Sequence, residues 1–200
     1  MIMKKVEELI VSTLKDVIDL QCITAATNQT KSKLVYPVKR DGTTRISEQE
    51  ARFLFVKHVD LSTEYFYSIE VPTKREFMFT GETPLSGNVD VCLYENGKRK
   101  HLIEFKALNP DQRSFSKDFE KLFNDEDGLD NYFVHILKNT NRATIPSIED
   151  KYRKAIENSR EKYKTLKSRL KIFVCVIEKR SITKYEINEN GSTSEPITVL

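Results

Sequence analysis

The chain has 200 residues, of which 38% are hydrophobic and 32% are charged, and its formal net charge is +3. No apolar run approaches the ~18 residues that a membrane-spanning helix needs, so we expect a soluble protein without membrane contact. The small net charge does not require a polyanionic partner, and any preference for one has to arise from local clusters of basic residues.

The three cysteines, Cys22, Cys92 and Cys175, lie far apart and form no CxxC or Cys/His pattern. An odd number without such spacing argues against a zinc site or a disulfide framework. Cys92 and Cys175 fall within apolar runs and are predicted to be buried free thiols, which suits a reducing, cytoplasmic location. Near the N-terminus, Glu7 and Glu8 interrupt the apolar core that a signal peptide would need.

The first third of the chain is predicted to contain two helices joined by a long connection. Apolar residues recur at helical spacing over 2–20, which predicts an amphipathic helix. Residues 21–46 are rich in Thr, Ser, Lys and Asn and are interpreted as a connection with a short strand over 34–38. Ser47 and Glu50 form a capping-box pattern that predicts the start of the second helix.

Alternating hydrophobicity or apolar runs then predict six strands, which cover 65–71, 89–94, 101–107, 132–137, 170–177 and 182–187. A short helix is expected over 114–123 and a long, highly charged one over 148–166. This order predicts an α/β fold in which helices cover a mixed β-sheet.

We expect a single domain over 1–200. Its core covers about 47–188, and the helix over 2–20 with the linker over 21–46 forms an N-terminal extension. The last ten residues are predicted to be frayed.

Three charged side chains interrupt strands that otherwise resemble buried core. Asp90 lies between two valines, and Glu104 and Lys106 flank Phe105. Burying a charge without a partner is costly, so such positions usually indicate ion pairing or metal coordination.

The pairing of these two strands decides whether the three charges meet. A two-residue Asn96-Gly97 turn would make paired residue numbers add to an odd sum, which puts Asp90 and Glu104 on opposite faces. An even sum puts Asp90, Glu104 and Lys106 on one face. The other face then holds the apolar set Val89, Val91, Leu93, Ile103, Phe105 and Ala107. A three-residue loop with Gly97 in the left-handed position of a bulge gives this register, so we predict a bulged hairpin.

Two carboxylates that share one face repel each other unless a cation joins them. Oxygen ligands without nearby His or Cys favour Mg²⁺ or Mn²⁺ over zinc. Lys106 points to the same face and is a candidate to orient a water molecule or to stabilise charge on a phosphate. A metal and a lysine beside a scissile phosphate make a hydrolytic centre.

Asp90, a gap of 13 residues and then Glu104-Phe105-Lys106 resembles the motif of the PD-(D/E)XK nuclease superfamily. The order helix, three strands, helix, strand over roughly 47–137 is also similar. The resemblance implies a restriction-endonuclease-like three-layer fold and a Mg²⁺- or Mn²⁺-dependent nuclease that hydrolyses phosphodiester bonds, in the first place of DNA. It implies metal binding by Asp90, Glu104 and the main-chain carbonyl of Phe105. The sequence departs from the motif at Asn88-Val89, where a proline can stand.

The superfamily often carries a further glutamate on the helix before the first strand, so Glu50 and Glu48 are candidates. The alternative for Glu50 is the capping box, and the alternative for Glu48 is a solvated position. Glu70 is a candidate metal or water ligand, or a plain strand-edge charge. Lys117 and Lys121 lie four residues apart on one helical face and are candidate phosphate contacts, or part of a solvated face.

Residues 147–171 hold nine basic and four acidic side chains. Such a stretch either neutralises phosphates of a nucleic acid or is simply a charged helix surface. His135 lies within an apolar run and is expected to be a core histidine. Phosphate-loop, dinucleotide-binding and nucleophile-elbow motifs are absent from the sequence.

Other functions stay open. In one, the nuclease fold is a binding or assembly module whose centre is unused. In another, the chain is a subunit of a restriction or mobile-element defence system whose specificity is supplied elsewhere. A homodimer formed through the helix over 2–20 is a further hypothesis, since cutting both strands of a duplex favours two active sites.

Overall fold

The computed structural model describes residues 5–25, 32–62, 64–79, 83–188 and 190–200. These residues form four helices and seven strands. The helices are α1 (Val6–Asp19), α2 (Glu48–Ser62), α3 (Gln112–Asn124) and α4 (Thr144–Tyr163). The strands are β1 (Phe66–Phe77), β2 (Leu85–Glu95), β3 (Lys98–Ala107), β4 (Asp130–Leu137), β5 (Arg169–Val176), β6 (Ser181–Ile187) and β7 (Ile197–Thr198).

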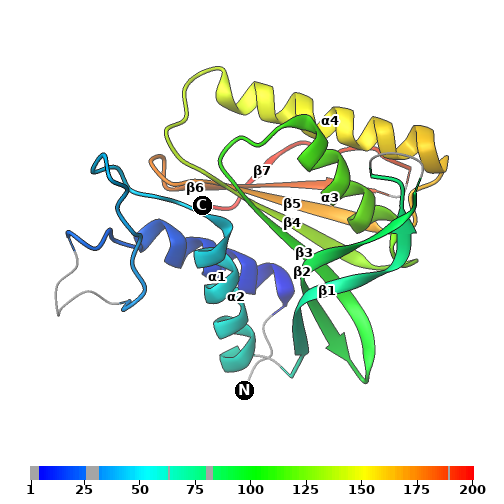
Figure 1. The fold of residues 1–200 in the computed structure, drawn as a ribbon, viewed down its shortest axis with the longest axis horizontal. Helices are drawn as coiled ribbons and strands as arrows, with labels where there is room; N and C mark the ends of the chain where they lie inside the picture. The colour runs from blue at the N-terminus through cyan, green and yellow to red at the C-terminus, as the bar shows by residue number, and fades with distance from the viewer. Residues whose placement is uncertain (1–4, 26–31, 63, 80–82, 189) are drawn as a thin grey trace.

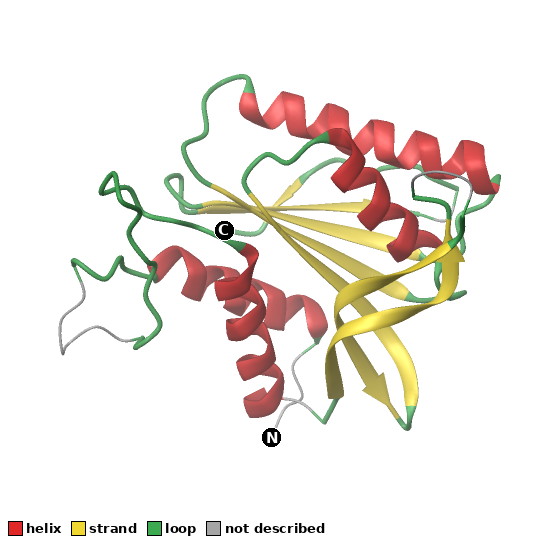
Figure 2. Cartoon of the chain, in the orientation of Figure 1, coloured by secondary structure: helices red, strands yellow, loops and turns green. Residues whose placement is uncertain are grey.

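The seven strands form one mixed sheet in chain order, β1 to β7. The pairs β3–β4 and β4–β5 are parallel, and the other neighbours are antiparallel. Each parallel pair is joined by a helix, α3 or α4. Crossovers of this kind are right-handed and here advance in one direction, so both helices fall on the same face of the sheet. Helices α1 and α2 lie on the other face (Figures 1 and 2). The expected α/β fold with a helix-flanked mixed sheet is confirmed.

Two hydrophobic clusters hold the three layers together. One packs α1 and α2 against Val91, Leu93, Ile103 and Phe105. The other packs α3 and α4 against the opposite face, which includes Cys92, Leu102 and Phe133. This alternation follows from the period of two along a strand, and it leaves even-numbered positions of β2 and β3 facing α3.

The predicted apolar face is confirmed for Val91, Leu93, Ile103 and Phe105, but the prediction for Val89 is wrong. Val89 packs with Val71 in the cluster under α3 and α4. The neighbouring strand β1 is irregular here, because Glu70 has a left-handed φ of 50° and the register shifts between Pro72 and Glu76. The β1–β2 pair therefore does not keep the simple alternation at this end.

Some predicted boundaries also change. Strand β1 continues through Pro72 to Phe77, which an edge strand tolerates because one side of it has no ladder partner. The segment over 34–38 makes only isolated bridges, with Tyr36 opposite Cys22 and Val38 opposite Thr44. The predicted frayed C-terminus is wrong at β7, which pairs with Thr183 and Lys184 of β6.

The N-terminal helix belongs to the core of the molecule. Leu9, Ile10 and Leu14 of α1 are completely buried in the cluster that also contains α2. The apolar face of α1, the candidate homodimer surface, therefore packs against other parts of the same chain. The predicted helix began at residue 2, and residues 2–4 lie outside the described residues. Within the described ranges, no helix is long and apolar enough to cross a membrane.

The hairpin of β2 and β3 has the even register at the charged positions. Val91 pairs with Ile103 and Leu93 with His101, whereas Glu95 pairs with Lys98 at the turn. The prediction of a three-residue loop is wrong. The turn has two residues, Asn96 and Gly97, with φ of 51° and 72°, which is the twist that antiparallel strands prefer. The extra residue is Lys100 in β3, and this bulge changes the register from odd to even.

Candidate active site

Strands β2 and β3 bring Asp90, Glu104 and Lys106 to the face that α3 covers. The register that pairs Val91 with Ile103 puts Asp90 opposite Glu104. Here the main chains part, and the N–H of Phe105 donates to Asp90 Oδ2 at 2.7 Å. The Asp90 side chain thus takes the place of a main-chain acceptor, which fixes its carboxylate at the point where the two strands separate.

Helix α3 adds two charged residues, Asp118 and Lys121. Lys106 Nζ lies 2.6 Å from Asp118 Oδ2, and Lys121 Nζ lies 3.1 Å from Asp118 Oδ1. Lys121 Nζ also contacts Glu104 Oε1 and donates to the carbonyl of Asn88 at 2.7 Å. The result is a continuous chain of charges, Lys106–Asp118–Lys121–Glu104, which we call the carboxylate–lysine cluster together with Asp90.

Arg52 of α2 reaches the cluster from the other side. Its Nη1 lies 3.4 Å from Asp90 Oδ1 and also contacts Glu70 Oε1. Glu70 is about half exposed, and its left-handed φ turns it out of the regular strand. Glu70 therefore lies at the rim of the site, bound to Arg52.

The cluster is deeply buried: the exposed fraction is 3% for Glu104, 6% for Asp118 and 7% for Lys121. Burial raises the pKa of Glu104 well above its usual value, and the charges of Asp118 and Asp90 add to this rise against the opposing effect of Lys121. Burial likewise raises the pKa of Asp90, although the Phe105 N–H and Arg52 oppose it. These carboxylates lie close enough to repel each other.

The cluster disfavours the charged form of its carboxylates, but it favours the charged form of its two lysines. Burial by itself lowers the pKa of Lys106, but the carboxylates of Asp118, Glu104 and Glu48 together outweigh it, and the pKa is raised above its ordinary value. The pKa of Lys121 is raised because Glu104 and Asp118 outweigh its burial. Both side chains are therefore cations at neutral pH, and Lys106 is suited to donating hydrogen bonds rather than accepting a proton.

The remaining candidates divide between the cluster and its surroundings. Glu50 serves the capping box, since its Oε2 accepts from the Ser47 hydroxyl at 2.8 Å and from the Ser47 N–H at 3.2 Å. Glu48, the first residue of α2, is half-buried and lies near enough to Lys106 to raise its pKa. Lys117 Nζ lies 5.5 Å above the ring of Phe79, so only Lys121 of the two lysines joins the cluster.

Two members of the site, Asp118 and Arg52, were missed from the sequence. A signal for Asp118 exists: Phe115, Asp118 and Leu122 have the i, i+3, i+7 spacing of a buried helical face. A carboxylate within such a stripe needs a partner. Nothing in the local pattern around Arg52 predicts that it reaches Asp90.

The donor set suits a hard divalent cation, because it contains carboxylate and carbonyl oxygens and no thiolate or imidazole. Asp90 lies near enough to Glu104 to help raise its pKa, although burial is the largest cause for both carboxylates. However, lysine and arginine take oxygens of both. Among the described residues, no three His, Cys, Asp or Glu side chains are arranged as a metal site.

The basic stretch over 147–171 is largely neutralised within the chain. Arg153 pairs with Asp150 and Glu157, and Lys154 pairs with Asp150. Lys162 pairs with Glu120 of α3. These contacts favour the charged-surface interpretation of α4 over a phosphate-binding one.

His135 is a core histidine, as expected. Its side chain is fully buried, with Nδ1 at 2.6 Å from the Tyr152 hydroxyl and Nε2 facing the carbonyl of Leu108. Burial lowers its pKa to about 4. The neutral ring thereby anchors the residue that follows β3, whose φ is 63°.

Comparisons with protein-family models, with curated proteins and with solved structures found no match for this chain. The function therefore has to be inferred from the carboxylate–lysine cluster itself.

Proposed function

We propose that the chain is a metal-dependent nuclease of the restriction-endonuclease-like fold, which hydrolyses phosphodiester bonds, in the first place of DNA. The observation that carries this proposal is that Asp90 and Glu104 follow directly on the last pair of the β2–β3 ladder, Val91 and Ile103. Asp90 lies near enough to raise the pKa of Glu104, and Lys106 is two residues further along β3. The order α2, β1, β2, β3, α3, β4 agrees with the order that the PD-(D/E)XK resemblance implies.

In this proposal Asp90, Glu104 and the carbonyl of Phe105 hold Mg²⁺ or Mn²⁺. The bound ion would supply charge stabilisation to the phosphate and make a coordinated water more acidic. The chain's own contribution is positional. The N–H of Phe105 fixes the Asp90 carboxylate. The carbonyl of Phe105 and the Asp90 oxygens, which would bind the ion, therefore keep a fixed position relative to each other.

Lys106 acts as a cation toward the substrate. Its raised pKa makes it a hydrogen-bond donor that orients a water molecule or stabilises charge on a phosphate oxygen. Asp118 is its positioning residue, since it holds Lys106 Nζ at 2.6 Å. Arg52, next to Asp90, is a second cation at the same end of the sheet and is suited to a neighbouring phosphate.

A second candidate is favoured by one observation. Lys121, Lys106 and Arg52 already neutralise the three carboxylates of the site. A centre whose charges are balanced without metal fits a nuclease fold that serves only as a binding or assembly module, or as a subunit of a defence system with its own centre unused.

Nuclease activity tests the first candidate. Plasmid, linear and single-stranded DNA and RNA are incubated with the protein and Mg²⁺ or Mn²⁺, with EDTA as a blank. We expect cleavage that EDTA abolishes and that Lys106→Ala reduces by roughly a hundredfold or more. Lys100→Ala is the matched control, since Lys100 lies on the same strand but pairs with the surface residue Glu95.

Two results would decide against the enzyme. If Lys106→Ala cuts as fast as wild type, the proposed role of the lysine is wrong. If no nucleic acid is cut and neither metal raises the melting temperature, the module is the better description, because a protein that binds a ligand only when folded is stabilised by it.

A further inference from the structure

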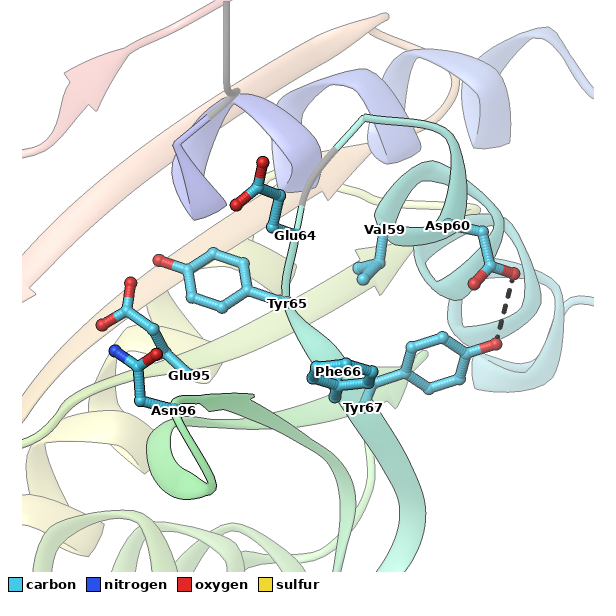
Figure 3. Close-up of a pocket in the computed structure, with 8 residues that line it drawn as sticks. All are labelled: Val59, Asp60, Glu64, Tyr65, Phe66, Tyr67, Glu95 and Asn96. Atoms are coloured by element: carbon cyan, nitrogen blue, oxygen red, sulfur yellow. Dashed lines mark hydrogen bonds between the residues drawn. The ribbon is translucent and has the colours of Figure 1, made fainter.

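An open groove lies at the start of β1, away from the carboxylate–lysine cluster. Its volume is about 790 Å³. The end of α2, the first residues of β1 and the β2–β3 turn line it: Val59, Asp60, Glu64, Tyr65, Phe66, Tyr67, Glu95 and Asn96. Figure 3 shows Tyr65 extending between Glu64 and Glu95, with Tyr67 on the other side of the strand, toward Asp60.

The aromatic lining is unusual for a free surface. Phe66 has 77% of its surface exposed, although a phenylalanine at a strand end gains most from burial. Tyr65 and Tyr67 are half-buried beside it, and the Tyr67 hydroxyl donates to Asp60 Oδ2 at 3.3 Å. Tyr65 also packs edge-on against His101, with 5.8 Å between the ring centroids, so Phe66 is the ring of this groove that is most open to a ligand.

The groove is also strongly negative. Asp60, Glu64 and Glu95 contribute three carboxylates, and α2 ends here with no basic residue in its last turn, so that the helix dipole adds to the negative potential. Lys100 pairs with Glu95 at 3.1 Å and offsets part of this negative charge. Aromatic faces next to carboxylates are the combination that recognises ammonium and guanidinium groups.

The position of β1 indicates what kind of ligand carries these cations. Strand β1 is the end of the sheet, so half of its main-chain N–H and C=O groups point away from β2 and are available to an added strand. Its later part is protected by Pro72, Lys74 and Arg75, whereas Phe66 to Ile69 carries no such protection. A second copy of this chain that docked through the same groove would bring three more carboxylates against these three, and the phosphates of a nucleic acid would be repelled likewise.

We propose that this groove docks an extended, basic segment of a partner protein, which adds to the edge of β1 and places an arginine or lysine side chain over the Phe66 ring, beside the carboxylates of the groove. The segment pairs along Phe66 to Ile69 with its alternate side chains in the groove. This interaction is independent of the proposed nuclease chemistry, because no residue of the groove belongs to the carboxylate–lysine cluster.

The test uses the whole chain and a fluorescein-labelled peptide of alternating arginine and valine with blocked ends, followed by fluorescence anisotropy. We expect saturable binding that weakens as salt is added. Phe66→Ser should weaken it by about tenfold, the contribution of one cation–aromatic contact. Phe53→Ser is the matched control, since Phe53 on α2 is 56% exposed and does not line the groove. Glu64→Gln and Glu95→Gln should each weaken binding by roughly threefold or more.

The same series contains the outcomes that would overturn the proposal. An alternating glutamate–valine peptide that binds equally well would exclude recognition of cations. Equal affinities for Phe66→Ser and Phe53→Ser would exclude the groove. Sedimentation that shows a dimer of the chain alone, dissolved by Phe66→Ser, would assign the surface to a second copy instead. Amide NMR signals perturbed by the peptide should belong to residues 64–69 and 95–96, and a set elsewhere would also refute it.

Discussion

Replacing Lys121 with methionine tests whether this lysine is the internal counter-ion of the cluster. Lys121 Nζ lies 3.1 Å from Asp118 Oδ1, and at this separation two unit charges attract by about 5 kcal/mol at an effective dielectric constant of ~20. The variant also avoids burying an ammonium. Removing one partner of a buried pair typically costs about 3–5 kcal/mol, so we expect a loss of this size in the free energy of unfolding in EDTA.

The divalent ion should have the opposite effect in this variant. With the ammonium gone, Glu104 is a buried carboxylate without a cation, whereas Asp118 keeps Lys106. Mn²⁺ can then approach Glu104 without displacing a lysine. We expect tighter Mn²⁺ binding by Lys121→Met than by wild type, by about tenfold or more. Urea unfolding with EDTA and with a series of Mn²⁺ concentrations measures both effects, because the gain in stability depends on the ratio of free metal to Kd.

Lys117→Met is the control, one turn away on the same helix, where the side chain lies over Phe79. It should change neither quantity by more than about 0.5 kcal/mol. Lys121→Arg keeps the charge and should keep wild-type metal affinity. If Lys121→Met loses less than about 1 kcal/mol in EDTA, or binds Mn²⁺ no better than Lys117→Met, the lysine is not the counter-ion that the geometry indicates.

Three further predictions concern stability and pH. The pKa of His135 falls from 6.5 to about 4 on folding, so protonation favours the unfolded chain. The stabilising effect is complete above pH 6.5, and the free energy of unfolding decreases by about 3 kcal/mol as the pH falls to 4. Urea titrations should show a flatter dependence on pH for His135→Gln. Gly87→Ala should cost about 1–3 kcal/mol by thermal melts, because its Cβ would lie 2.9 Å from Lys121 Cδ. Asp118→Asn removes the main cause of the raised Lys106 pKa, so the alkaline limb of the cleavage rate against pH should move to lower pH; an unchanged limb would separate the two residues.

The hairpin could be predicted from the sequence because its information is local. A charge between core residues on each of two adjacent strands, and the requirement that apolar side chains share a face, are enough to give the even register of Asp90 and Glu104. The position of the bulge is not determined in this way. A longer turn and an extra residue in β3 produce the same register, and the favourable twist of the Asn96-Gly97 turn selects the second solution, at Lys100.

The rest of the site depends on how distant elements approach each other. The sequence around Lys121 is equally compatible with a solvated face, because helical spacing indicates which residues share a face but not what lies opposite them. Its burial follows from the crossover that lays α3 over β3, and from Gly87, whose missing side chain leaves room for the lysine stem. Arg52 is brought to Asp90 only by the packing of α2 on the other side of the sheet.

Charge balance leads to a last prediction, that metal and phosphodiester bind together. Three carboxylates, Asp90, Glu104 and Asp118, face three cations, Arg52, Lys106 and Lys121. A divalent ion alone would leave the buried cluster with an excess of two positive charges, which is costly at low dielectric, whereas a phosphate diester brings a negative charge and can take Lys121 or Arg52 from a carboxylate. We therefore expect dimethyl phosphate to tighten Mn²⁺ binding by about fivefold or more, and Mn²⁺ to tighten dimethyl phosphate binding by the same factor. Calorimetric titration of each ligand with and without the other measures both. Independent binding of the two would mean that the cluster does not form one electrostatic unit with its substrate, and a binding module with an unused centre predicts that neither ligand affects the other.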